Sequence, residues 1–405
     1  MKRIFLFSAF LVLLFSSAAQ TDVGYEIKVT FKPFKNQYIY LGHYFGKTYP
    51  IIDSALLNEK SEAIFKGDGN LNGGIYLIGY PKKTGFFEVL VDKQQRFSIT
   101  ADTATIGSSI KFENSSDNVL FNHYQQFMTG KGKEINKLKD SYKTSTSKKD
   151  SAAIREKLIK LDEDIAAFRN DIIKNYPGNI LTALLMTMKE PALTGRLKNP
   201  KTKEDSLASW QYYKDHFWDD VSFYDGRIAY TTFFEEKLDK YFNQIVVPHP
   251  DSVIKELDWM LGTASINSEM TRFLLIKFVN RYLNQKYMWE DAVFLYLFEK
   301  YFAQKEHSWL TAAGKKVITD RAYSLMANIM GTPASDIELP DSTGAMKSMF
   351  AEKGNFTMVI FWDPTCGHCK EVLPQIDSVY REKWKADSVN IYAVSKETDG
   401  TKKDW

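Results

Sequence analysis

The sequence of 405 residues predicts a multidomain protein with an N-terminal antiparallel β sandwich or barrel, a central all-α helical domain and a partial C-terminal α/β domain. Three observations predict this order. Apolar residues first alternate with polar ones, then recur at helical spacing, and finally form continuous runs that flank one helix. We place the three parts at residues 20–115, 116–330 and 331–405.

Residues 1–19 have the layout of a secretory signal peptide. Lys2 and Arg3 precede the apolar run 4–15, and small residues follow up to Ala19, after which we expect cleavage. The run is shorter than the ~20 apolar residues that a spanning helix needs, and no later stretch of the sequence is long and apolar enough to span a bilayer. We therefore expect a mature chain without a membrane span in the periplasm or another extracytoplasmic compartment, and an uncleaved anchor is the alternative.

The charge balance argues against a nucleic-acid partner. The 53 basic and 50 acidic residues nearly cancel, and no basic stripe is interleaved with stacking aromatic residues. The lysine-rich segment 131–149 also carries acidic residues, so we interpret it as a solvated helix face or loop. The histidines are scattered without an i, i+4 metal-binding pair, and we predict no metal site from them.

The segment 20–115 is predicted to form the β domain. Its first strand places four apolar side chains on one face, namely Tyr25, Ile27, Val29 and Phe31. The same pattern recurs, between polar turns, at 38–45, 74–80, 86–92 and 96–102. Many short strands joined by polar turns are typical of a small antiparallel sandwich or barrel.

The segment 116–330 is predicted to be helical. One apolar stripe with alternating spacings of four and three consists of Ile154, Leu158, Leu161, Ile165, Phe168 and Ile172. Pro177 and Gly178 end this helix. Further helices are expected at 179–188, 253–264, 270–283, 290–303 and 315–329. The aromatic-rich segment 209–227 is interpreted as part of the helical core rather than as a ligand groove.

The third part has the pattern of a βαβ unit. After a linker, a short strand and a turn comes the apolar run 355–363, which is typical of a strand buried on both faces. The segment 370–384 is predicted to be a helix, and 389–397 is predicted to be a second buried strand.

Both cysteines of the chain, Cys366 and Cys369, lie where the first of these strands passes into the helix. The free N–H groups of a helix N-terminus stabilise a thiolate. We therefore expect Cys366 to be the nucleophile and Cys369, one turn later, to resolve a mixed disulfide without any cofactor.

Three other roles for the cysteine pair were weighed. A zinc site needs four ligands, but the sequence has no second C-x-x-C or histidine pair. Covalent haem needs C-x-x-C-H, but Lys370 occupies the last position. A permanent structural disulfide suits an exported protein, although so short a loop constrains little of the unfolded chain. We favour the redox role.

The segment FWDPTCGHCKEVLP, residues 361–374, resembles the active-site segment of the thioredoxin superfamily. Trp362 matches the tryptophan after the buried strand, and Pro374 matches the proline within the helix. The lead-in 331–344 is similar to the opening of exported bacterial thiol-disulfide oxidoreductases related to ResA and TlpA. The resemblance implies an incomplete thioredoxin-like domain behind accessory N-terminal parts. It also implies envelope protein thiols and disulfides, and a membrane electron donor, as partners.

The residues between the cysteines, Gly367 and His368, form the dipeptide found in protein disulfide isomerases. A histidine here favours the Cys366 thiolate and makes the couple more oxidising, so reductase, oxidase and isomerase roles all stay open. Two positions depart from the family. Ile360 replaces the buried aspartate of thioredoxins, and Val372 replaces the glutamate of ResA-like proteins, with a glutamate one position earlier.

No proline follows Pro374, so the cis-proline of the thioredoxin fold is absent, and we expect the sequence to be a C-terminally truncated fragment that may lack activity as given. The sequence thus predicts an extracytoplasmic thiol-disulfide oxidoreductase. The alternative is an envelope module that binds a ligand or a protein, with a subordinate or degenerate thioredoxin-like tail. A peroxidase is a third option.

Overall fold

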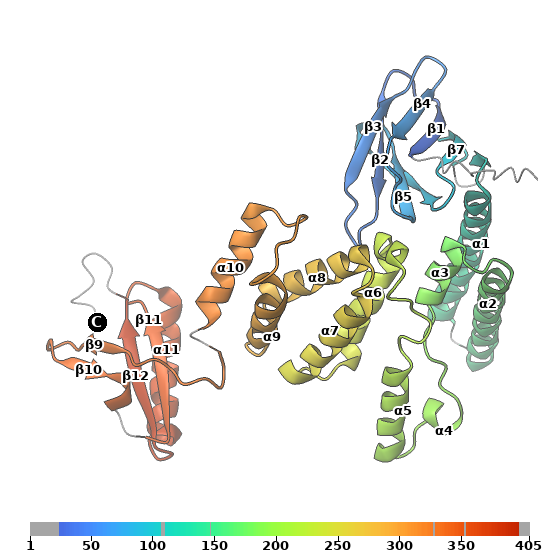
Figure 1. The fold of residues 1–405 in the computed structure, drawn as a ribbon. Coiled ribbons are helices and arrows are strands. Elements are labelled where there is room, and N and C mark those ends of the chain that lie inside the picture. Colours follow the sequence, from blue (N-terminus) through green and yellow to red (C-terminus); the bar gives the residue numbers. More distant parts are fainter. Residues whose placement is uncertain (1–23, 107–109, 146, 327–328, 352–353, 397–405) are drawn as a thin grey trace, which may run out of the picture. The chain divides into compact units, whose positions relative to one another are not determined.

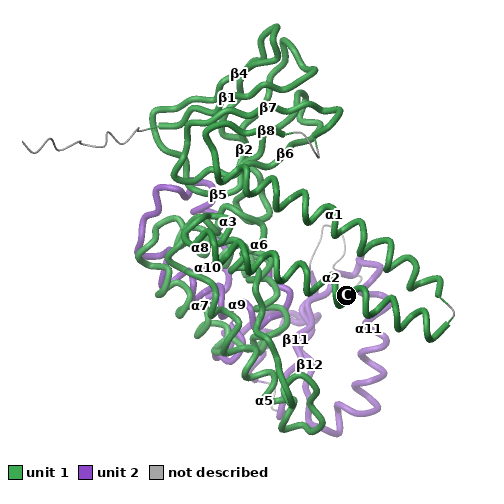
Figure 2. Tube along the Cα trace, turned by 90° about the vertical axis from the view of Figure 1, so that its right-hand side faces the viewer, with its two compact units in different colours: residues 1–284 green, residues 285–405 purple. Residues whose placement is uncertain are grey.

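The computed structural model describes five stretches of the chain: 24–106, 110–145, 147–326, 329–351 and 354–396. The chain divides into two compact units, residues 1–284 and residues 285–405, and each is described here by itself (Figure 2). The predicted signal peptide, residues 1–19, lies outside the described residues.

The first unit begins with two four-stranded sheets packed face to face (Figure 1). The strands are β1 (Tyr25–Lys32), β2 (Tyr38–His43), β3 (Ile51–Leu56), β4 (Glu62–Gly67), β5 (Gly74–Gly79), β6 (Phe86–Val91), β7 (Arg96–Asp102) and β8 (Lys111–Glu113). One sheet has the order β4-β1-β7-β8, and the other has the order β3-β2-β5-β6.

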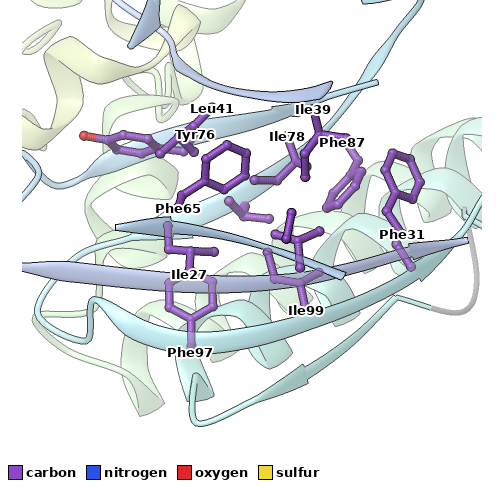
Figure 3. Packing of buried hydrophobic residues seen from close by; sticks show 14 of the residues in the cluster. Ile27, Phe31, Ile39, Leu41, Phe65, Tyr76, Ile78, Phe87, Phe97 and Ile99 are labelled. Atoms are coloured by element: carbon purple, nitrogen blue, oxygen red, sulfur yellow. The ribbon is translucent and has the colours of Figure 1, made fainter. Parts of the chain in front are cut away.

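The core of this sandwich lies between the sheets (Figure 3). Alternate side chains of β1, including Ile27 and Phe31, point into it and meet Phe65 of β4 and Ile78 of β5. All four of these side chains are fully buried. The predicted β domain is therefore confirmed, and its inward-facing residues are the apolar members of the alternating pattern.

The prediction of a purely antiparallel sandwich is wrong in one pairing. β1 and β7 run parallel, with Ile27 opposite Phe97 and Val29 opposite Ile99. The chain leaves β1, forms the strands from β2 to β6, and returns to the side of β1 in the same direction. Such a parallel neighbour requires a long crossover connection, which the intervening strands supply.

Helices make up the rest of the first unit. The longer ones are α1 (Ser116–Thr144), α2 (Lys148–Asn175), α3 (Ile180–Thr187), α5 (Lys203–Asp215), α6 (Thr232–Lys240), α7 (Pro250–Ala264) and α8 (Ser268–Leu283). The shorter ones are α4 (Gly195–Lys198), η2 (Gly226–Tyr230) and the π-helical turn η3 (Tyr241–Ile245), besides the turn η1 (Pro81–Lys83) in the β domain. The aromatic segment 209–227 does contribute to the core, because Phe217, Trp218 and Phe223 are buried.

Buried contacts join the sandwich to the helices within the first unit. The side chain of Asn118 in α1 accepts a hydrogen bond from the Leu90 N–H and donates one to the Leu90 carbonyl. These bonds satisfy backbone groups of β6 that would otherwise be unpaired at the edge of its sheet. Arg227 of η2 forms an ion pair of 2.7 Å with Asp92. Gly74 lets η2 approach β5, since a Cβ there would lie 2.3 Å from that of Tyr230.

The second unit contains two helices and the C-terminal α/β segment. Its elements are α9 (Glu290–Leu297), the π-helical turn η4 (Phe298–Phe302), α10 (Ala312–Met326), β9 (Glu338–Pro340), β10 (Met346–Ser348), η5 (Met349–Ala351), β11 (Phe356–Trp362), α11 (Gly367–Val379), η6 (Tyr380–Trp384) and β12 (Val389–Ser395). β11 and β12 are parallel and α11 connects them, so the predicted βαβ unit is confirmed. Among the described residues no helix is both long and apolar enough to cross a bilayer.

The expectation that both strands of this unit are buried on both faces is wrong. Phe356 and Phe361 of β11 have exposed fractions of 69% and 70%. The two faces of a parallel sheet are buried when helices cover both of them, and in the described unit the single helix α11 connects β11 to β12. Continuous apolar sequence indicated the direction and pairing of the strands, but not how many strands accompany them.

Candidate active site

The site is built where β11 passes into α11. Asp363 and Thr365 form a tight turn, in which the Asp363 carboxylate accepts hydrogen bonds from the Thr365 backbone N–H at 2.7 Å and from its hydroxyl at 2.6 Å. Cys366 then adopts an extended conformation, with φ −75° and ψ 116°, as the N-cap of α11. The turn thus delivers the thiol to the positive end of the helix dipole.

The Cys366 sulfur occupies the place of an N-capping oxygen. Its Sγ accepts a hydrogen bond from the backbone N–H of Cys369, with an N–S distance of 3.4 Å. This bond is the largest cause that lowers the pKa of the Cys366 thiol, followed by the Cys369 side chain, and the His368 backbone N–H adds to it. Desolvation and the negative charge of Asp363 act in the opposite direction. The balance favours the thiolate, as helix-terminal donors should.

The second thiol lies one helical turn from the first. Cys369 is in the first turn of α11, and both cysteines are half-buried free thiols, so a partner molecule can reach the pair. The structure therefore brings the two predicted thiols together at one helix end. One accessible sulfur has a lowered pKa and can attack a disulfide, and the neighbouring sulfur can resolve the mixed disulfide that results.

The four residues that the sequence placed around the cysteines, Trp362, Gly367, His368 and Pro374, lie in different parts of the βαβ unit. Trp362 ends β11, half-buried, and its backbone carbonyl accepts a hydrogen bond from the N–H of Lys396 at 2.8 Å. Gly367 begins α11, and apart from its chain neighbours and the backbone of its own helix no atom lies within 4 Å of the position that a Cβ would take. The contribution of His368 to the Cys366 pKa comes from its backbone N–H. Pro374 lies inside α11, where its ring nitrogen cannot donate the usual helical hydrogen bond.

Sequence reasoning missed Asp363. Its carboxylate is held by Thr365, and these hydrogen bonds lower the pKa of Asp363, so the group carries a negative charge at neutral pH. The same charge raises the pKa of Cys366. The signal was present in the sequence, because an aspartate two residues before a threonine is typical of an Asx turn.

We expect Asp363→Asn to lower the pKa of Cys366. Asparagine keeps the oxygen that accepts the Thr365 hydrogen bonds but removes the charge that opposes the thiolate. Alkylation of Cys366 by iodoacetamide at pH 6 should become about two- to threefold faster, because the thiolate fraction rises. The pH dependence of alkylation measures this pKa.

The matched control for this variant is Asp387→Asn. Asp387 is exposed and lies before the start of β12, at the opposite end of the parallel strands from the cysteines. Its replacement should leave the alkylation profile unchanged. An unchanged or raised Cys366 pKa in Asp363→Asn would show that the carboxylate does not act on the thiol.

A family model matches the part of the chain that contains the two cysteines. Residues 330–405 match the AhpC/TSA family. The chain carries an AhpC/TSA, thioredoxin-like domain at its C-terminus. The thioredoxin-like domain includes β11, α11, β12 and the cysteine pair, so the predicted likeness to the thioredoxin superfamily is confirmed. The narrower assignment to the ResA and TlpA group stays a prediction.

One further family model matches the helical region, and two other comparisons concern the chain as a whole. Residues 189–328 match a domain of unknown function, DUF5106. No curated protein matches the chain. The chain is similar to the crystal structure of a thioredoxin-like protein from Bacteroides caccae, with 15% identity and a TM-score of 0.39, over 54% of this chain and 76% of that one.

Among the described residues, no group of three or more His, Cys, Asp or Glu side chains is placed to hold a metal ion. The chemically reactive groups described at the site are the two sulfurs, and the backbone N–H of Cys369 donates to one of them.

Proposed function

We propose that this protein is an extracytoplasmic thiol-disulfide oxidoreductase that exchanges disulfides with envelope proteins through Cys366 and Cys369. One observation carries the proposal. The Cys366 sulfur caps α11 and accepts the Cys369 N–H, and its pKa is lowered while it stays accessible. A sulfur held only for structure needs neither accessibility nor a stabilised anion.

The first step is attack of the Cys366 thiolate on a disulfide of the client protein. A bond forms between Cys366 Sγ and one client sulfur, the client disulfide breaks, and the second client sulfur leaves as a thiolate. The lowered pKa of Cys366 raises the fraction of the nucleophilic thiolate at a given pH. The N–H of Cys369, which stabilises the Cys366 anion before the attack, is fixed by the first turn of α11.

The second step is resolution by Cys369. Its thiol loses its proton to the departing client thiolate or to water, and its sulfur then attacks Cys366 Sγ. The mixed disulfide breaks, the client leaves with both sulfurs reduced, and the Cys366–Cys369 pair is left oxidised. A dithiol donor, which we place at the membrane, reduces the pair again. Run in reverse, the same steps oxidise a client.

The extracytoplasmic location is supported by residues 1–19 alone, with their basic start, short apolar run and small residues before the expected cleavage point. The mass of the mature N-terminus of the exported protein tests it. A chain that starts at residue 20 agrees with the proposal, and a retained residue 1 in the cytoplasmic fraction contradicts it.

The experiment that tests the function compares two oxidised substrates with the same protein. We expect the protein to catalyse reduction of insulin disulfides by dithiothreitol at least about tenfold more efficiently than reduction of hydrogen peroxide, because Cys369 can resolve a mixed disulfide with a protein. The measurement is kcat/KM for each substrate. Faster turnover of peroxide would replace this proposal with a peroxidase, and no turnover of either would leave the cysteines without an enzymatic role.

A further inference from the structure

The first unit contains an open depression of about 640 Å³ that the thiol chemistry does not use. It lies where the loop between β2 and β3 meets α8. The lining side chains used in the argument are those of His43, Phe45, Lys47, Tyr49, Pro50 and Arg272. Its volume falls within the range of small-molecule sites, which is roughly 300–1,000 Å³.

The loop that forms one wall is fixed to the helical region. The Gly46 N–H donates to the Ala229 carbonyl at 3.1 Å, and the Lys47 N–H donates to the Glu235 carboxylate at 2.7 Å. Gly46 has φ +58°, and a Cβ there would lie 1.8 Å from a Glu235 oxygen, so only glycine fits. Because the wall is held in place before any ligand arrives, binding costs little ordering of the loop.

The cationic groups of the depression are also held in position. The Arg272 guanidinium donates to Glu269 at 2.6 Å and to the Tyr230 hydroxyl at 3.0 Å, and it lies 5.0 Å from the centre of the Phe45 ring. Lys47 pairs with Asp239 but is half exposed. The residues that line the depression include these two cations and no carboxylate, and an ammonium group that donates to one carboxylate still has two N–H donors for a ligand.

The other walls are rings. Tyr49 has an exposed fraction of 61%, and its ring centre lies 6.1 Å from that of Phe86. The His43 ring packs against Tyr230 with centres 4.9 Å apart. Burial lowers the pKa of His43, so this ring is neutral at pH 7 and offers a flat surface rather than a third charge.

The geometry points to a binding site for a small organic carboxylate that carries a ring. The carboxylate would face Arg272 and Lys47, and the ring would pack on Tyr49 and the neighbouring Phe45. Two sources share this chemistry, an aromatic acid and an acidic sugar. The site belongs to the first unit, and its existence does not depend on the proposed disulfide exchange.

Calorimetric titration of the full chain with sodium benzoate and with sodium glucuronate tests the site. We expect saturable binding of at least one of them with a Kd on the order of 0.1–1 mM, which is typical of so few atoms. Benzyl alcohol, which has the ring alone, and acetate, which has the carboxylate alone, should bind at least about tenfold more weakly. If benzoate binds and glucuronate does not, the ligand is an aromatic acid. If glucuronate binds and benzoate does not, the ligand is an acidic sugar.

Two variants tie the binding to the depression. Tyr49→Ala and Lys47→Gln should each weaken it about fivefold or more, and the Lys47 contribution should shrink at high salt. Lys35→Gln is the matched control, because Lys35 is exposed and precedes β2, at the opposite end of that strand from His43. If neither acid binds saturably, or if binding persists in both variants, the proposal is wrong.

Discussion

Replacement of Cys366 by serine is expected to abolish disulfide exchange, with at least about a 1,000-fold loss of insulin-reducing turnover. A hydroxyl at this position cannot form the anion that the helix end stabilises in the thiol, because its pKa is far too high for the same donors to ionise it. The measurement is kcat/KM for insulin reduction, with the wild-type protein and the variant assayed side by side.

The loss should occur without loss of the fold. Cys366 is the N-cap of α11, and serine is a preferred N-cap residue whose oxygen can accept the same Cys369 N–H. Thermal unfolding of the variant should therefore start no earlier than that of the wild-type protein. Ala386→Ser is the control, since it adds a hydroxyl at an exposed position after η6, away from the thiols, and should retain turnover. Normal turnover in Cys366→Ser would exclude the proposed mechanism.

The sequence indicated most of the strands in which burial separates the two faces, but β4, whose residues also alternate between buried and exposed, was not predicted. β1 and β7 alternate inward apolar residues with outward polar ones, and both were found from that pattern. β3 was missed because none of its residues is buried, and it belongs to the sheet only through its pairing with β2. Pairing is a long-range property that a single-strand pattern does not contain, and the parallel contact of β1 with β7 was missed for the same reason.

The candidate thiol site was predictable because it is local. Cys366 and Cys369 are three positions apart, and one strand and one helix fix their geometry. The role of Asp363 was missed because its effect depends on a turn that points the carboxylate back along the chain. The depression in the first unit was beyond sequence reasoning, since Lys47 and Arg272 meet only after the β2–β3 loop docks on the helices.

Replacement of Cys369 by serine separates attack from resolution. Cys366 keeps its place at the helix end and the backbone N–H of residue 369 remains, so the first attack should still occur. The mixed disulfide between Cys366 and the client then has no internal thiol to break it. We expect multiple turnover to fall at least about 100-fold while a covalent adduct with one client molecule accumulates.

The adduct should be visible by mass spectrometry and on non-reducing gels, and dithiothreitol should release the client. Alkylation of Cys366 in the variant should remain faster than that of a free cysteine, which separates a missing resolving thiol from a damaged nucleophile. The double variant with Cys366→Ser should form no adduct. Full turnover by Cys369→Ser would mean that the second sulfur is not needed, as in a single-thiol mechanism. Failure to form any adduct would mean that Cys366 does not attack proteins, even though its anion is stabilised.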